Sequence, residues 1–238
     1  MVIHMPSEAS LPLIVIACRV FEGILEKYLP EDHRNDIEFL DYGLHSTPKR
    51  LKDVIQTRID SLERPSLVML GYGLCGNGLD GIHAGRHILL VPRTDDCIAL
   101  LLGSYQAYRR EFDAVPGTYY LTKGWLESGS NPLQEYQEYV QKYGTATSDW
   151  IMDQQYRHYQ RIALVAHSQE DLDHYRSRAK QVAEYCQRWG LRYEEIQGSD
   201  EYLRRLVETA LNLEKANSDF NVVPPGGVLQ QSQFIRMA

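Results

Sequence analysis

Short apolar runs alternate with amphipathic stretches along most of the chain, and this alternation is the strongest constraint on its fold. Several of the runs are rich in β-branched residues, as in strands that are buried on both faces of a sheet. Strands that alternate with helices predict an α/β fold with a mostly parallel sheet and helices on both faces. The predicted strands are 13–17, 37–40, 67–70, 88–91, 162–166, 191–196 and 222–223, and the predicted helices are 21–28, 48–62, 97–112, 170–189 and 201–213.

The segment 117–160 interrupts the alternation, because it is rich in aromatic and polar residues and has a weaker period. We expect it to form a loop, one or two surface helices or a lid, from which Lys123 and Trp125 could line a pocket. Core packing is the favoured role of Trp125. The segment separates an N-terminal α/β half, 1–116, from a C-terminal half, 161–238. A chain of 238 residues can form one large domain or two Rossmann-like halves.

Charge and hydropathy exclude several classes of partner. The formal net charge of -7 argues against nucleic acid and anionic membranes, which both need a basic face. No stretch approaches the roughly 20 apolar residues that span a bilayer, and the first residues lack the pattern of a signal peptide. We therefore expect a cytoplasmic protein with reduced thiols. These thiols would serve in packing, metal ligation or redox chemistry, and they belong to Cys18, Cys75, Cys97 and Cys186.

Three cysteines and a histidine follow four successive predicted strands. Cys18 and His45 come after the first and second strands, and Cys75 and Cys97 after the third and fourth. In open α/β sheets, ligands bind beyond the carboxyl ends of the strands, so these side chains are expected at one edge. Three thiolates and an imidazole suit tetrahedral zinc, whereas three thiolates with an open position suit a catalytic metal or an iron–sulfur cluster. His45 is either the fourth ligand or a nearby acid–base group.

Other roles for the cysteines remain open. Each of them could be a small buried hydrophobe, and this is the favoured interpretation for Cys186, which lies inside a predicted helix. Cys97 begins a predicted helix, where exposed amides favour the thiolate and make a nucleophile. The like charges of Asp95 and Asp96 oppose this, so a ligand role is preferred for Cys97.

The loop 71–76, Gly-Tyr-Gly-Leu-Cys-Gly, matches the GxGxxG pattern of dinucleotide-binding proteins, and Asp95 lies nineteen residues beyond it. However, the glycine-containing segment 77–86 is too short for the full helix that this function needs. The favoured interpretation is a turn that brings the backbone close to a ligand while presenting Cys75. Candidate cofactor contacts are then Tyr72, Gly73 and Gly76.

The turn after the fourth predicted strand contains Arg93 and Asp96, which are candidate catalytic residues together with His45. The guanidinium of Arg93 could hold a carboxylate or phosphate group, or it could pair with an aspartate and stabilise the turn. His167 follows the fifth predicted strand and is a weaker candidate to face a ligand.

Four motifs together resemble a family numbered sixteen thirty-eight in the domain-of-unknown-function series. The motifs are Leu-His-Ser-Thr-Pro at 44–48, the glycine loop at 71–76, Pro-Arg-Thr-Asp-Asp-Cys at 92–97 and Gly-Thr-Tyr-Tyr-Leu-Thr at 117–122. The resemblance implies an association with corrinoid-dependent methylamine and methoxy-compound methyltransferase systems. It also implies a corrinoid protein or methyltransferase as partner and a corrinoid as a possible cofactor. It favours a metal or metallocofactor role, because such systems need corrinoid reduction, loading or repair.

The leading hypothesis is a metal- or metallocofactor-binding protein, an accessory enzyme of one-carbon or corrinoid metabolism. Its ligands would be Cys18, Cys75 and Cys97, and its cofactor zinc or an iron–sulfur cluster. One alternative is a nicotinamide- or nucleotide-dependent oxidoreductase that uses the glycine loop. Another is a non-catalytic, partner-binding α/β protein whose cysteines are merely packed.

Overall fold

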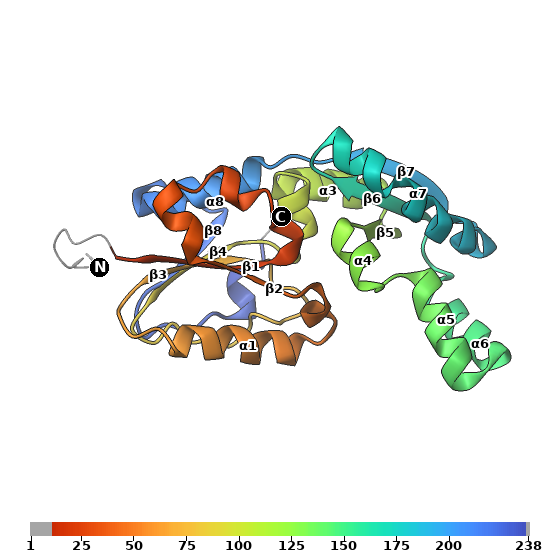
Figure 1. Ribbon diagram of the computed structural model, residues 1–238, viewed down its shortest axis with the longest axis horizontal. Helices are drawn as coiled ribbons and strands as arrows, with labels where there is room; N and C mark the ends of the chain where they lie inside the picture. The colour runs from red at the N-terminus through yellow and green to blue at the C-terminus, as the bar shows by residue number, and fades with distance from the viewer. Residues whose placement is uncertain (1–10, 237–238) are drawn as a thin grey trace.

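The computed structural model describes residues 11–236 and confirms the predicted α/β class (Figure 1). The side chains of Asn35, His45 and Ser46 lie outside the described part. A five-stranded sheet has the order β2-β1-β3-β4-β8, and a three-stranded sheet the order β5-β6-β7. The strands of the first sheet are β1 (Leu13–Cys18), β2 (Ile37–Leu40), β3 (Leu67–Gly71), β4 (Ile88–Pro92) and β8 (Phe220–Val223). Those of the second are β5 (Thr118–Leu121), β6 (Arg161–Ala166) and β7 (Arg192–Gln197).

The first sheet holds the larger core. Its strands β2, β1, β3 and β4 are parallel, and β8 pairs antiparallel with β4. Helix α1 (Pro48–Asp60) covers one face and α8 (Glu201–Leu211) the other (Figure 1). Since β3 and β4 are covered on both sides, every residue of both strands is buried.

The second sheet is entirely parallel, and α7 (Gln169–Cys186) packs on it. Two further helices, α5 (Pro132–Tyr143) and α6 (Thr145–Tyr156), form a hairpin that projects from this lobe (Figure 1). At the base of the sheet the buried guanidinium of Arg161 pairs with Glu111 and Glu194. Glu111 belongs to α3 (Tyr105–Ala114), so its ion pair with Arg161 connects α3 to the sheet.

The chain crosses between the lobes twice. It leaves the first sheet through α3 and returns after β7, so that α8 and β8 complete the first sheet. The segment 161–238 therefore contributes to both sheets. At the returning crossover, Gly198 N donates to the carbonyl of Ala166 and Ser199 N to that of Leu101, which joins the end of β6 to the first lobe.

Two predicted helices are wrong in detail. Residues 21–28 form short 3-10 turns at Arg19–Phe21 and Leu25–Lys27 instead of one helix, and Gly23, with φ 82°, separates them. The predicted helix 97–112 is two helices, α2 (Ile98–Leu101) and α3, which are separated at Gly103 (φ 86°). A left-handed glycine ends α2. The hydroxyl of Ser104 then caps α3 by accepting from Ala107 N.

The segment 117–160 is more regular than its sequence indicates. It begins with β5, a strand that the sequence analysis missed, and continues with α4 (Lys123–Ser128), α5 and α6. The remaining predicted strands and helices are confirmed, with ends shifted by a few residues. Among residues 11–236, the structure contains no helix with the length and apolar character that a membrane span requires.

The strand order creates a crevice at the carboxyl edge of the first sheet. Strand β1 has β2 on one side and β3 on the other. The connection from β1 to β2 packs against α8, whereas α1, which connects β2 to β3, lies on the opposite face. Connections that leave on opposite faces open a crevice between the strand ends, where ligands bind in folds of this kind. The end of β1 is Cys18.

We predict that Gly198→Ala destabilises the protein, because the new methyl group would lie 2.0 Å from the carbonyl oxygen of Leu101. Overpacking against backbone of this kind costs about 1–3 kcal/mol, measured as the free energy of unfolding in urea. Ser199→Ala is the matched control. It removes only the hydroxyl that accepts from Glu201 N and should cost about 1 kcal/mol or less. Equal stability of Gly198→Ala and wild type would contradict the close packing of residue 198 against the backbone of Leu101.

Candidate functional site

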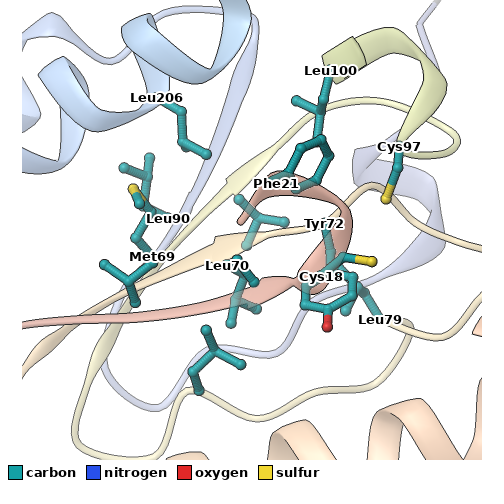
Figure 2. Close-up of a cluster of buried hydrophobic side chains, with 14 of the residues drawn as sticks. Cys18, Phe21, Met69, Leu70, Tyr72, Leu79, Leu90, Cys97, Leu100 and Leu206 are labelled. Atoms are coloured by element: carbon teal, nitrogen blue, oxygen red, sulfur yellow. The ribbon is translucent and has the colours of Figure 1, made fainter. Parts of the chain in front are cut away.

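Three cysteines from separate strand ends meet in the crevice. Cys18 ends β1, Cys75 lies in the loop after β3, and Cys97 directly precedes α2. The Sγ atoms of Cys75 and Cys97 are 3.5 Å apart, and the Cys18 thiol interacts with that of Cys97. All three are buried, and Figure 2 shows Cys18, Cys97 and Tyr72 together at one side of the hydrophobic cluster. Cys186 is not part of this group, because it lies in α7 and packs in the core of the second lobe.

The backbone of two loops sets the distance between Cys75 and Cys97. Leu74 N donates to Thr94 O and Cys75 N to Asp95 O, both at 2.9 Å, so the loop after β3 lies directly against the loop after β4. Gly73 permits this approach, since a Cβ atom there would be 2.6 Å from the backbone of Asp96. The glycine loop is thus used for close packing of backbone.

Cys75 has an unusual backbone conformation, with φ 48° in the left-handed region. The neighbours Gly76 (φ 61°) and Asn77 (φ 71°) share it. Residues with a side chain rarely adopt this region, and such strain is concentrated at functional sites. The strained turn presents Cys75 to the cavity that it lines with Gly76.

The C-terminal segment stabilises the loop after β4. The guanidinium of Arg236 donates twice to the carbonyl of Arg93 and once to Asp219, and Arg93 in turn donates to the carbonyl of Ile235. Arg93 does not line the cavity beside the cysteines. Its role as an anion-binding or catalytic residue stays a prediction.

A cavity of about 160 Å³ lies beside the three thiols. Both lobes build it, because Trp125 comes from α4 and the other walls from the first sheet and its loops. Of the sequence-predicted candidates, Tyr72, Gly76 and Asp96 reach it together with the cysteines, whereas Gly73 lies behind it against Asp96. The lining residues are Cys18, Val20, Tyr72, Cys75, Gly76, Asp96, Cys97, Ile98 and Trp125.

Sequence reasoning did not assign Val20 and Ile98 to the site. Both are apolar residues next to a cysteine in the chain, and apolar character alone cannot distinguish a pocket wall from core. The backbone of His45 lies in the 3-10 turn Tyr42–Ser46, after β2 as predicted. Its side chain is outside the described part of the chain, so its role as a ligand or an acid–base group stays a prediction.

The hydroxyl of Tyr72 is buried and has no hydrogen-bond partner among the described residues. The whole residue is only 2% exposed. Burial and the nearby sulfurs of Cys18, Cys97 and Cys75 raise the pKa of this phenol well above its usual value, so it stays protonated. Burying a polar group without a partner is costly. The Tyr72 hydroxyl is therefore a buried polar group whose cost no described residue offsets.

Asp96 is the acidic group of the cavity. Its Oδ1 accepts a hydrogen bond from Ile98 N at 2.8 Å. Burial raises the pKa of the carboxyl group to about 6, although its backbone hydrogen bonds oppose the shift. A carboxyl group with a pKa near neutrality can both accept and donate a proton, as a general acid or base does.

Two of the three thiols, those of Cys18 and Cys97, have a raised pKa. The hydrogen bond with Cys97 and burial raise the pKa of Cys18 well above its usual value. For Cys97, the bond with Cys18 lowers the pKa, but the contact with Cys75 and burial outweigh it and raise the pKa overall. Protonated, buried thiols are poor nucleophiles. The arrangement therefore offers little support for Cys97 as a nucleophile without an added cation.

Two geometric findings bear on bound cofactors. Among the side chains that the structure describes, no group of three or more His, Cys, Asp and Glu residues stands ready to hold a metal ion. The thiols are in packing contact. After β3 the chain forms turns up to β4, so residues 72–87 contain no helix that could point its N-terminus at a pyrophosphate.

His167 faces a second, smaller cavity in the seam between the lobes, which Thr122 and Lys123 also line. Its ring hydrogen-bonds to the backbone of Leu100, and its Nε2 atom has no partner among the described residues. Burial lowers the pKa of this imidazole to about 4. Val20 lines both cavities, so they adjoin.

We predict that Gly73→Ala separates the two cysteine loops. The added methyl group would lie 2.6 Å from the backbone of Asp96, which should cost about 1–3 kcal/mol of unfolding free energy. The same variant should form a Cys75–Cys97 disulfide more slowly under mild oxidant. Gly43→Ala is the control, because its methyl group meets only the flexible carboxylate of Asp41. A Gly73→Ala protein that oxidises at the wild-type rate would contradict the packing argument.

We also predict that His167 makes stability depend on pH. Its pKa is about 4 in the folded protein and 6.5 in the unfolded chain. The unfolded state therefore takes up a proton first as the pH falls. The stabilisation is complete above pH 6.5 and is lost progressively down to about pH 4. In His167→Gln, the urea concentration at the midpoint of unfolding should change less between pH 6.5 and about pH 4 than it does in wild type. His87→Gln serves as comparison, since burial also lowers the pKa of His87. An unchanged slope in His167→Gln would contradict the assignment.

Comparison with known proteins identifies a family. The family model described as "Protein of unknown function (DUF1638)" matches residues 39–207. Neither a curated protein nor a solved structure matches the chain significantly. The matched segment contains Cys75, Cys97 and Trp125, and it begins after Cys18. Because the match covers most of the chain, including both loops that build the cysteine site, the protein belongs to the DUF1638 family.

Proposed function

We propose that the protein binds a thiophilic metal ion or a small metallocofactor through Cys18, Cys75 and Cys97. The observation that carries this proposal is the convergence of three thiols from three strand ends beside a cavity. Packing alone explains three buried thiols, but it does not explain the adjoining space.

The spacing of the sulfurs supports the proposal. Two thiolates on one tetrahedral zinc ion, each about 2.3 Å from it, are about 3.8 Å apart. The 3.5 Å between Cys75 Sγ and Cys97 Sγ is close to this value. Metal binding would displace the thiol protons and replace the thiol–thiol contacts. Among the described side chains no group of three or more His, Cys, Asp and Glu residues stands ready to hold a metal ion, so the thiols would have to rearrange on binding.

The donor set favours zinc or an iron–sulfur cluster, because thiolates are soft ligands that select these metals. A bound ion would supply Lewis acidity or redox capacity at this edge of the sheet. The protein's own residues would hold it, exclude bulk water and, through Asp96, move a proton beside it. The braced loop with Cys97 and the strained turn with Cys75 would keep two of the ligands in place.

The resemblance to corrinoid-associated proteins extends the proposal to an accessory role in one-carbon methyl transfer. A cavity of about 160 Å³ is smaller than the roughly 300–1,000 Å³ of drug-sized ligand sites. It suits an ion with a small ligand, and it is far too small for a corrin ring. We therefore place any corrinoid in a partner, a corrinoid protein or methyltransferase, on which this protein would act.

The oxidoreductase alternative is less well supported. Gly73 and Gly71 have packing roles in the structure, since Cβ atoms there would meet Asp96 and Ala17 at 2.6 Å. With no helix between β3 and β4, the glycine loop lacks the element that would bind a pyrophosphate.

The test is metal analysis with a visible spectrum on untagged protein purified both aerobically and anaerobically. We expect about one zinc per chain or an iron–sulfur absorbance. Replacing any one of Cys18, Cys75 and Cys97 by serine should weaken metal binding by more than about ten-fold. Cys186→Ser is the matched control, because Cys186 is equally buried but lies in α7 of the other lobe. Metal-free protein in both preparations that also takes up no added zinc would refute the proposal.

A further inference from the structure

Cys75 and Cys97 form a closely spaced pair of free thiols. Their Sγ atoms are 3.5 Å apart, whereas the sulfurs of a disulfide bond are about 2.0 Å apart. Two backbone hydrogen bonds join the loops that contain these cysteines, so the sulfurs stay within reach of each other. Two neighbouring thiols of this kind are the reduced form of a dithiol–disulfide pair.

Both cysteines of the pair line the cavity, and neither is completely covered. Cys75 remains 8% exposed and Cys97 7%. Gly76 also lines the cavity and, like Asn77, is exposed, so the cavity reaches the surface of the protein next to Cys75. A small molecule that enters from solution therefore meets Cys75 first.

The surroundings of Cys97 are more buried than those of Cys75. Cys97 directly precedes α2, in which every residue is buried. Its thiol has a raised pKa, which disfavours attack on a molecule from solution. A sulfur that is held next to the attacking atom reacts far more readily, because no encounter in solution is needed. Cys97 is therefore suited to attack Cys75 after Cys75 has reacted.

The backbone of Cys75 favours a reversible bond over a permanent one. Its φ of 48° lies in the left-handed region, which is strained for a residue with a side chain. Disulfides at strained positions are readily reduced, and they are the ones that serve in redox chemistry. A bond between Cys75 and Cys97 should therefore open again when a small thiol is supplied.

The walls of the cavity define which molecules it admits. Its volume of about 160 Å³ is below the roughly 300–1,000 Å³ of drug-sized ligand sites, so a compact molecule is required. Val20, Ile98 and Trp125 form apolar walls. Asp96 is acidic, and among residues 11–236 no lysine or arginine lines the cavity. An anionic molecule would therefore meet like charge and find no counter-charge.

We propose that Cys75 and Cys97 are a dithiol that reduces a small, uncharged disulfide, RSSR, from solution. The Cys75 thiolate attacks one sulfur of RSSR and forms a mixed disulfide, and the first RS⁻ leaves and takes up the proton that Cys75 lost. Cys97 then attacks the Cys75 sulfur, forms the Cys75–Cys97 bond and passes its proton to the second RS⁻. Two electrons move from the protein to the disulfide, and two molecules of RSH are released. An excess of a small thiol reverses both steps.

This inference goes beyond the proposed metal site and does not depend on a bound ion. Its experiment therefore uses reduced, full-length protein with a chelator present throughout. Hydroxyethyl disulfide is the probe, because it is compact and uncharged. Iodoacetamide then blocks the remaining thiols, and trypsin cleaves the protein without reduction. Arg86 and Arg93 lie between Cys75 and Cys97, so the two cysteines end on separate tryptic peptides unless a disulfide joins them.

We expect mass spectrometry to find the peptides of Cys75 and Cys97 linked, and dithiothreitol to separate them. Cys97→Ser should stop at the first step, with one mercaptoethanol group attached to Cys75. Cys75→Ser should lose the linked pair. Cys186→Ser is the matched control and should behave as wild type, because Cys186 is buried in α7 of the other lobe. Far-UV circular dichroism checks that each variant is folded.

The substrate class has its own comparison. Dithiodiglycolate has the same chain length as hydroxyethyl disulfide but carries two carboxylates. It should react at least about five-fold more slowly, since one like charge at about 4 Å in water has an effect of this size. Equal rates for the two reagents would overturn the preference for an uncharged disulfide.

Two results would overturn the dithiol itself. One is a folded wild-type protein whose Cys75 and Cys97 peptides stay unlinked in hydroxyethyl disulfide. The other is a link between Cys97 and Cys18, which lies on a third tryptic peptide because Arg19 follows it. Metal-free protein in the elemental analysis would refute the proposed metal site alone, because the chelator removes metal from this experiment.

Discussion

The pairing of two loop backbones is the interaction on which the site depends. The hydrogen bonds from Leu74 N to Thr94 O and from Cys75 N to Asp95 O extend the contact of β3 and β4 beyond the sheet. Gly73 allows the close approach. Without this pairing, the loop that contains Cys75 and the loop that contains Cys97 would not be joined to each other. With it, their sulfurs are 3.5 Å apart beside Cys18, at the crevice that the strand order opens.

The architecture explains why the chain returns to its first lobe. Strand β8 covers the free side of β4, and the residues after it brace the loop that leads to Cys97 through Arg236 and Arg93. The second lobe contributes α4, whose Trp125 lines the cavity. The cysteine site is thus built from both ends of the chain and its middle, and any relative movement of the lobes would change the volume of the cavity.

The sequence was sufficient for the α/β class and for the meeting of three cysteines, because continuous apolar runs and the rule on strand ends depend on local pattern alone. It was not sufficient where tertiary packing decides. Strand β5 was missed because Tyr119 and Tyr120 within it are only partly buried. The break at Gly103 and the return of β8 depend on contacts distant in sequence. The contact of Arg93 with the C-terminal segment likewise joins residues that are distant in sequence.

X-ray absorption at the metal edge of zinc-loaded protein tests most directly whether the three cysteines bind one ion. If they do, the zinc has three sulfur neighbours at about 2.3 Å and one lighter neighbour, and it loses one sulfur in each of Cys18→Ser, Cys75→Ser and Cys97→Ser. A zinc ion surrounded only by oxygen and nitrogen, or one unaffected by these substitutions, would contradict it. The cysteines would then be packing residues in the core.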